Sequence, residues 1–173
     1  FRAALITALV IPIAMLMTAI GMWQGRISAN LMSLGALDFG LIVDGAVIIA
    51  ENSLRHLAER QRELGRVLSL DERLQTVTAS TSEMIRPSVY GQVIIILVYV
   101  PLLTFTGVEG KMFEPMALTV ILALAAAFVL SLTLVPALIA ITITGRVQEK
   151  ENWLVAALKR WYSPLLRRAV ATP

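Results

Sequence analysis

Three carboxylates lie in or beside one apolar stretch of this sequence. Asp38 and Asp44 interrupt residues 31–50, which carry no other charge, and Glu51 follows directly. On translocon-based scales a central Asp opposes membrane insertion by about 2.5–3.5 kcal/mol, so two of them in one span require an explanation. Desolvation and a nearby cation shift a carboxyl pKa in opposite directions, and an Asp balanced between them can load and release a proton near neutral pH. This chemistry predicts a proton relay.

Helix geometry relates the three side chains to one another. Successive residues turn by about 100°, so Asp44 and Glu51 lie about 20° apart and share a face. Asp38 lies about 120° from Asp44, on an adjacent face, and about 9 Å away along the helix axis. We therefore expect a ladder of carboxylates within one membrane helix.

The same span contains Gly35, Gly40 and Gly45, and small residues of this kind allow a neighbouring helix to pack closely. A purely structural alternative is that the aspartates pair with Lys or Arg on another helix. The apolar stretches contain no Lys or Arg, so such a cation would have to come from outside them. An intramembrane aspartyl protease needs two Asp side chains that face each other at close range, usually from two helices. No other predicted span contains an Asp, which opposes that reading.

The composition favours an integral membrane protein. Of the 173 residues, 57% are hydrophobic and only 16% are charged, whereas about a quarter of the residues in a typical soluble domain are charged. The absence of cysteine excludes disulfides, thiolate zinc sites and cysteine nucleophiles from this chain. We do not expect a nucleic-acid-binding protein, because in a membrane protein the basic residues report orientation.

The elements that must position the carboxylates are membrane helices. We predict an all-α integral membrane fold in which residues 1–145 form the transmembrane region and a linker joins its second and third spans. The predicted segments are spans 3–23, 31–51, 87–108 and 115–145, linker 52–86, and an amphipathic interfacial helix within 146–173. Of the 15 basic residues, all but Arg26 and Lys111 lie in the linker or near the two ends. The positive-inside rule therefore places the linker and both ends in the cytoplasm.

Local signals refine this outline. The pattern S-x-x-E from Ser69 to Glu72 predicts a capping box at the start of a helix. With a break near Gly65, the linker is expected to form two surface helices. Residues 107–114 are predicted to form a short turn, and the lone His56 is expected to be solvated. Because the chain opens on Phe1 without an initiator Met, we expect it to be part of a longer polypeptide.

Residues 38–52 read D-F-G-x3-D-G-A-V-x3-E-N, a pattern that resembles the fourth transmembrane helix of the resistance-nodulation-division (RND) transporters of the heavy-metal efflux branch. Residues 86–88, 107–116 and 134–138 resemble parts of that family's fifth and sixth helices. The resemblance covers essentially the whole chain, with residues 3–23 as the third helix.

This resemblance implies a fragment of a larger RND-type helix bundle in a bacterial inner-membrane, multi-pass, proton-driven antiporter. Asp44 matches the family's central proton-relay aspartate, and Asp38 and Glu51 match two further carboxylates of the metal branch. The implied energy source is the proton gradient, with no bound cofactor. The implied partners are the rest of the same polypeptide, two further copies in a homotrimer, a periplasmic adaptor, an outer-membrane channel and membrane lipids.

The same resemblance bears on the substrate. The multidrug branch has two adjacent aspartates where this chain has Asp44 and Gly45, which argues against drugs. Silver and copper exporters lack the acid matched by Asp38, which points to divalent cobalt, zinc, cadmium or nickel. The metal contacts of the periplasmic domains cannot be carried over to this chain. A drug or lipid exporter of the same superfamily is the alternative, and we expect the chain alone to transport nothing.

Overall fold

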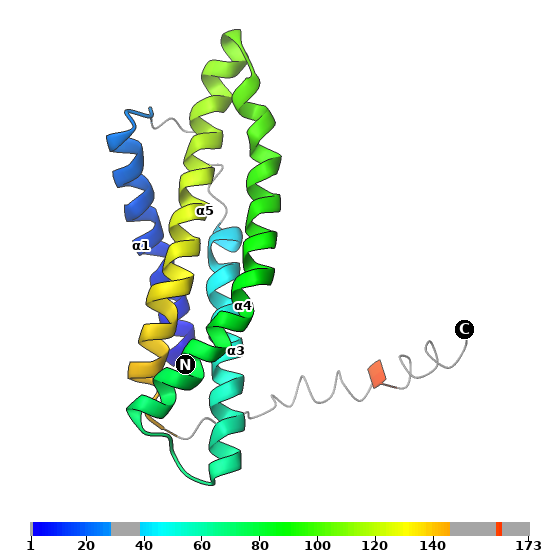
Figure 1. Ribbon diagram of the computed structural model, residues 1–173. Coiled ribbons are helices and arrows are strands. Elements are labelled where there is room, and N and C mark those ends of the chain that lie inside the picture. The colour runs from blue at the N-terminus through cyan, green and yellow to red at the C-terminus, as the bar shows by residue number, and fades with distance from the viewer. Residues whose placement is uncertain (1, 29–38, 146–161, 164–173) are drawn as a thin grey trace, which may run out of the picture.

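The computed structural model describes residues 2–28, 39–145 and 162–163, and those residues contain helices and no strand. The elements are α1 (Arg2–Gln24), α3 (Phe39–Leu64), α4 (Leu70–Tyr99), the short 3₁₀ helix η1 (Val100–Thr104) and α5 (Gly107–Thr142). The long helices lie side by side in one elongated bundle (Figure 1). The prediction of an all-α fold is confirmed.

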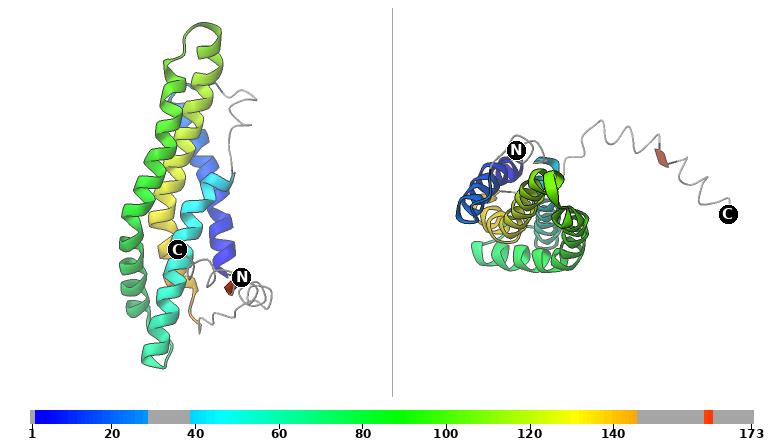
Figure 2. Two further views of the ribbon diagram at one scale, coloured as in Figure 1. Left: turned by 90° about the vertical axis from the view of Figure 1, so that its right-hand side faces the viewer. Right: turned by 90° about the horizontal axis from the view of Figure 1, so that it is seen from above.

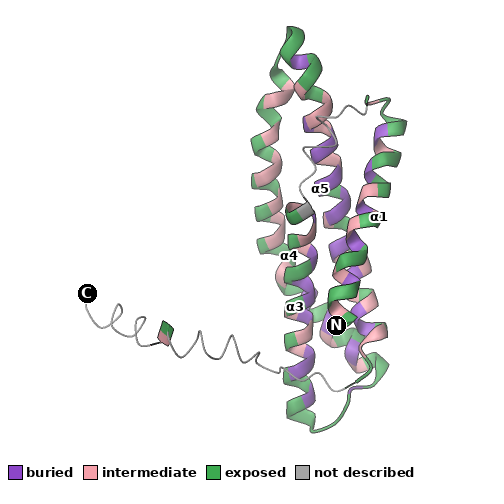
Figure 3. Cartoon of the chain, turned by 180° about the vertical axis from the view of Figure 1, so that it is seen from behind, coloured by how far each residue is buried: buried purple, intermediate pink, exposed green. Residues whose placement is uncertain are grey.

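Helix α5 is the centre of the bundle, because it contacts α1, α3 and α4. Figure 3 shows buried residues along much of its length, and the view from above in Figure 2 shows the other helices gathered around it. Many of its buried residues are small, which lets neighbouring backbones approach. They include Ala117, Ala123, Ala126, Ala127, Ser131 and Ala140.

Three stretches of helix are long and apolar enough to cross a membrane: Arg2–Gln24, Leu70–Thr104 and Gly107–Thr142. Helix α1 is apolar on all sides and leaves Leu5, Leu16 and Ile20 more than half exposed, as expected for side chains that face lipid or other membrane helices. The predicted second span includes residues outside the described part of the chain, and its described portion lies in α3.

The linker differs from the prediction of separate surface helices. Helix α3 continues from the predicted second span to Leu64, and α4 runs without interruption from Leu70 into the predicted third span. Most of residues 54–64 are Leu, Arg, Ala, Glu or Gln, which favour helices, and no Gly or Pro stands between Glu51 and Leu64 to end α3. Pro87 removes only one backbone donor, so α4 continues past it, although Figure 1 shows its lower part running obliquely to its upper part.

The loop between α3 and α4 has the predicted boundaries. Helix α3 ends at Leu64, and Gly65 follows with a φ of 66°, a conformation that glycine adopts without strain. Ser69 caps α4, because its hydroxyl accepts from the Glu72 backbone N–H while the Glu72 carboxylate accepts from the Ser69 N–H. The predicted capping box is confirmed.

The turn between the third and fourth predicted spans lies earlier than predicted. Residues 107–114 are helical, and the chain reverses at Phe105 and Thr106, after η1. Gly107 has a φ of 72°, and a Cβ at Gly110 would overlap the backbone carbonyl of Phe105. The two glycines therefore shape a tight entry into α5, where the sequence pattern of charged residues indicated a loop.

The C-terminal end of α5 is held by side chains from the other three helices. The last carbonyl groups of a helix have no partner within it and favour cationic donors. The contacts are Arg2 Nη1 to the Thr142 oxygen at 3.0 Å, Arg73 Nη1 to the Ile143 oxygen at 2.8 Å, and Gln61 Nε2 to the Gly145 oxygen at 3.2 Å. Four segments thus converge at the end of the bundle where α3 and α4 are joined.

Candidate functional site

Asp44 lies in the second turn of α3 and borders a cavity of about 260 Å³ between α3, α4 and α5. Its side chain is exposed rather than enclosed by the described helices. Most of the surrounding surface is apolar. It is formed by Leu41, Ile48, Met84, Pro87, Ile95 and Phe128, with Gly45 and Gly91 completing the helical walls. A carboxylate in such a place meets the first requirement of a relay, which is access from a cavity within an apolar bundle.

Two polar side chains of α4 line the same cavity. Ser88 and Gln92 are four residues apart, so they lie one turn apart on the same face. The Gln92 Nε2 donates to the backbone carbonyl of Leu124 in α5 at 3.2 Å. The amide therefore joins α4 to α5 next to the cavity and is held in a defined orientation.

Gly45 brings α3 close to α5. A Cβ placed on this residue would lie 3.5 Å from Ser131 Oγ and 3.8 Å from Ser131 Cβ, which is ordinary van der Waals contact. The Ser131 hydroxyl donates to the Phe128 carbonyl at 2.8 Å, within α5. Asp44 is thus adjacent to a point where the two helices meet through small residues.

Glu51 lies on α3, nearer the α3–α4 loop than Asp44, and its side chain is exposed. The next residue, Asn52, donates from Nδ2 to the Ser80 carbonyl of α4 at 3.0 Å. The hydroxyls of Ser53 and Ser80 are 3.2 Å apart, and both residues are fully buried. Below Glu51, therefore, hydrogen bonds join α3 to α4.

One turn further along α3, His56 Nε2 lies 3.3 Å from Glu83 Oε2 of α4. The His56 side chain is 35% exposed, so it is partly solvated as expected, and it also has a carboxylate neighbour on α4 that was not predicted. Sequence spacing could not show this contact, since the two residues meet only when the helices pack.

A second ionic group lies in the α3–α4 loop. The Arg66 guanidinium donates to both Glu72 carboxylate oxygens, at 2.9 and 2.6 Å. This hydrogen bonding, together with the bond from the Ser69 backbone, lowers the pKa of Glu72 from 4.5 to about 2. The pair fixes the loop at the start of α4, far along the chain from Asp44.

The remaining predicted site residues are placed only in part. Asp38 and Gly35 lie outside the described residues, and Gly40 lies in the first turn of α3. Within the described ranges no group of three or more His, Cys, Asp or Glu side chains is arranged to hold a metal ion. The structure therefore shows Asp44 and Glu51 on one helix, and it describes no metal-binding cluster.

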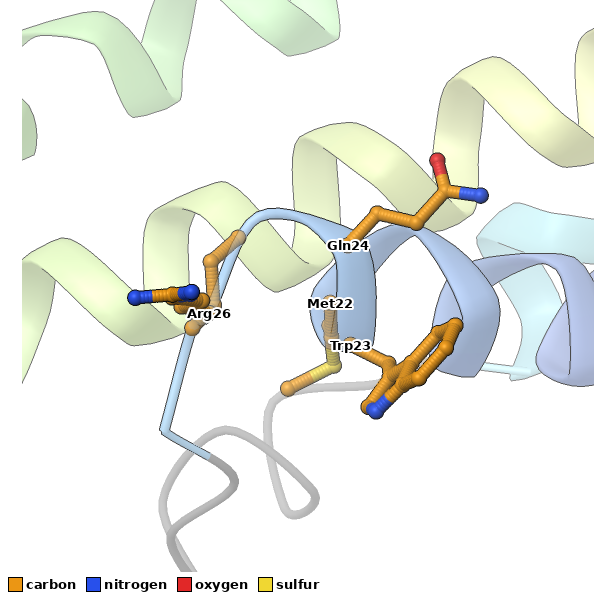
Figure 4. A pocket seen from close by; sticks show the side chains of 5 residues that line it. Met22, Trp23, Gln24 and Arg26 are labelled. Carbon is orange, nitrogen blue, oxygen red and sulfur yellow. The ribbon is translucent and has the colours of Figure 1, made fainter.

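A hollow of about 680 Å³ at the far end of α1 is lined by Met22, Trp23, Gln24, Arg26 and Ile27. Figure 4 shows the side chains of Trp23, Gln24 and Arg26 pointing in different directions. These groups do not converge on a common point, so the hollow lacks the arrangement expected of a binding site.

The sequence analysis missed Ser88 and Gln92. Their signal was present, because two polar residues four positions apart in an otherwise apolar span define a polar stripe on one helix face. The sequence did not show which neighbouring helix this polar stripe faces, because that depends on how α4 packs against α3 and α5.

Comparisons with known proteins bear on this arrangement. The sequence profile of the AcrB/AcrD/AcrF family matches residues 1–173. The nickel-cobalt-cadmium resistance protein NccA of Alcaligenes xylosoxydans xylosoxydans is 62% identical over 173 residues, which are 100% of this chain. The cobalt-zinc-cadmium resistance protein CzcA of Cupriavidus metallidurans is 57% identical over 170 residues, or 98% of this chain. The chain spans 16% of the length of each relative.

The fold is also similar to a solved structure. A crystal structure of a heavy metal efflux pump aligns with a TM-score of 0.65 and 40% sequence identity. The alignment covers 82% of this chain and 13% of that pump.

Proposed function

This chain belongs to the AcrB/AcrD/AcrF family, in the heavy-metal branch of the RND transporters, and we propose on that premise that it is the proton-relay part of a metal-ion/proton antiporter. The observation that carries the proposal is the position of Asp44. Its exposed carboxylate borders a hollow between α3, α4 and α5 whose walls are mostly apolar. A charged group is costly there unless it exchanges a proton or meets a cation.

In this proposal Asp44 takes up a proton from one side of the membrane and releases it to the other, while the pump changes shape. Asp38 and Glu51 act as further proton-exchanging carboxylates of the same relay. The proposed role of Gly35, Gly40 and Gly45 is to allow close packing of neighbouring helices. Protonation drives transport only if it favours one of two arrangements of the protein over the other.

The test is Asp44→Asn in the full reading frame that contains this chain. Asparagine preserves shape but cannot carry the proton, so we expect metal efflux to fall by about a hundredfold or more, as for loss of an acid–base group. Asp71→Asn, which makes the same change on an exposed surface of α4, is the matched control and should transport normally. Normal efflux by the Asp44→Asn protein at equal membrane abundance would refute the relay.

The relatives' names support divalent metals as substrates, since they record resistance to nickel, cobalt, cadmium and zinc. We propose that the pump lies in the bacterial inner membrane and exports one or more of these ions. In this proposal it is a homotrimer joined to a periplasmic adaptor and an outer-membrane channel. Efflux assays with each of the four metals would identify the substrate. We further propose that the 173-residue chain alone, reconstituted in vesicles, inserts but shows no metal-dependent proton flux.

We also propose the membrane orientation. The basic residues of the α3–α4 region support a cytoplasmic position for that end of the bundle and a periplasmic position for the turn before α5. A reporter active only in the periplasm should be active after Gly110 and silent after Gly65. The reverse pattern would refute this topology.

A further inference from the structure

The cavity beside Asp44 has one polar wall, and that wall belongs to α4. Among the described residues that line it, Ser88 and Gln92 are the polar side chains other than Asp44 itself, and the remaining side chains are apolar. A hydroxyl and an amide do not stabilise an apolar span in lipid, because burying a polar group costs free energy unless the group is hydrogen-bonded. Their common face toward Asp44 therefore requires a reason beyond membrane insertion.

Their hydrogen bonding leaves capacity for water. Gln92 uses Nε2 to donate to Leu124, which fixes the amide and leaves its carbonyl oxygen without a partner among the described residues. The Ser88 hydroxyl likewise has no hydrogen-bond partner in that part of the chain. No buried side-chain N or O atom there lacks a partner, so these groups are accessible rather than sealed.

The cavity also has room for water. Its volume of about 260 Å³ compares with about 30 Å³ for one water molecule in the liquid, and a retained water needs two to four polar partners. Gly91, between Ser88 and Gln92, adds space, because a Cβ there would meet nothing within 4 Å. The cavity can therefore hold several waters in contact with Asp44.

We propose that Ser88 and Gln92 are positioning residues that hold a chain of water molecules against Asp44, through which its proton arrives and leaves. The inference rests on the proposed function, since it assigns the route to the same carboxylate. A proton enters the water chain from solution, passes between waters and binds a carboxylate oxygen of Asp44. On release it returns to a water, and no other bond is made or broken.

The first experiment measures hydration directly in the full-length protein, with any cysteines outside this chain replaced by serine. Gly91→Cys places a thiol in the cavity, and this chain has no native cysteine. A charged, membrane-impermeant methanethiosulfonate should modify it, because a thiolate attacks the reagent to form a mixed disulfide with loss of methanesulfinate, and thiolates form only in contact with water. Val98→Cys, on the exposed apolar side of α4, is the control and should not react. An unreactive Gly91→Cys would overturn the proposal.

The second experiment removes the polar wall. Ser88→Ala combined with Gln92→Leu should slow both thiol modification and metal efflux by about tenfold, the factor that corresponds to the loss of one or two hydrogen bonds. Ser88→Ala alone breaks no bond of the described structure, so it tests the idea even if the double variant is unstable, and it should slow both by about threefold. Ser88→Thr, which keeps the hydroxyl, should restore both rates. Gln75→Leu, the same change on an exposed part of α4, should alter neither.

The outcomes separate this inference from the proposed function. If Asp44→Asn abolishes efflux while the Ser88 and Gln92 variants keep normal efflux and labelling, the water route is wrong and the relay stands. If Asp44→Asn transports normally, the relay is wrong, whatever the labelling shows. Slowed efflux with unchanged thiol modification would also overturn the water route, because it would indicate a structural effect only.

Discussion

The packing of α3 against α5 at Gly45 predicts a sharp dependence on side-chain size. A Cβ at this position would lie 3.5 Å from Ser131 Oγ, so alanine fits without displacing α5. Alanine also favours the helix by about 1 kcal/mol over glycine. Leucine adds three more carbon atoms in the direction of Ser131, and overpacking of this kind costs about 1–3 kcal/mol. We therefore expect Gly45→Ala to be at least as stable as the wild type and Gly45→Leu to be clearly less stable.

The assay is the thermal midpoint of the full-length protein in detergent, followed by size-exclusion chromatography of heated samples. Ser131→Gly removes both atoms that lie within 4 Å of the added Cβ, so it should partly restore the Gly45→Leu protein. Residues in contact show coupling energies of about 0.5–3 kcal/mol in such double-mutant cycles. A Gly45→Leu protein as stable as the wild type, or additive effects of the two changes, would refute this account of the interface.

Three further substitutions test the ends of the helices. Gly110→Ala should lower the thermal midpoint, because its Cβ would overlap the Phe105 carbonyl and force the backbone to move at a cost of about 1–3 kcal/mol. Arg73→Met keeps the buried stem but loses a charged hydrogen bond to the end of α5, which should cost about 1.5–3 kcal/mol by the same measurement. Glu72 has a pKa lowered to about 2 by its hydrogen bonds with Arg66, so its stabilisation is present above pH 4.5 and is lost as the pH falls toward 2. Melting of the wild type and of Glu72→Gln should therefore differ at pH 7 and converge at low pH.

Two of these substitutions have a matched control variant, and the third is checked by its pH dependence. Gly91→Ala, where a Cβ meets nothing within 4 Å, should not destabilise the protein. Arg60→Met removes an exposed arginine paired with Glu63, and surface pairs of this type contribute about 0–1 kcal/mol. Equal losses in the test and control proteins would contradict the stated contacts. A constant difference between wild type and Glu72→Gln at every pH would show that the carboxylate charge is not responsible.

The sequence predicted the existence of the helices better than their ends. The uncharged runs that became α1 and α5 are long and apolar, and in a membrane such a run has few alternatives to a helix. The ends depend on competition between local signals. Ser69 marked the start of α4 correctly because a capping box satisfies backbone donors whatever the tertiary structure. The charged residues 107–114 indicated a turn. They instead form the first two turns of α5, because the chain reverses before Gly107.

The candidate site could be predicted from the sequence only in part. Asp44 could be singled out as a candidate from one residue, since a carboxylate in an apolar span is costly unless it has a partner or a function. Ser88 and Gln92 could not be assigned to it, because their relation to Asp44 exists only once three helices enclose a cavity. The His56–Glu83 contact has the same origin, as 27 residues of chain and a helix reversal separate its partners.

The contacts of α3 indicate where a relay could convert protonation into movement. Beyond Glu51, α3 is hydrogen-bonded to α4 through Asn52 and Ser80, so separating these helices there would break buried bonds. Beside Asp44 the contact with α5 is instead van der Waals packing of Gly45 on Ser131. Sliding at such a surface requires no exchange of hydrogen bonds, whereas a buried polar group left unpaired costs about 1–3 kcal/mol. Helix α3 is continuous from Phe39 to Leu64, so under the proposed relay a shift at Asp44 would also move Asn52, which is bonded to α4. Helix α4 is in turn bonded to α5 through Gln92, so such a shift would have to be resisted or shared at that contact.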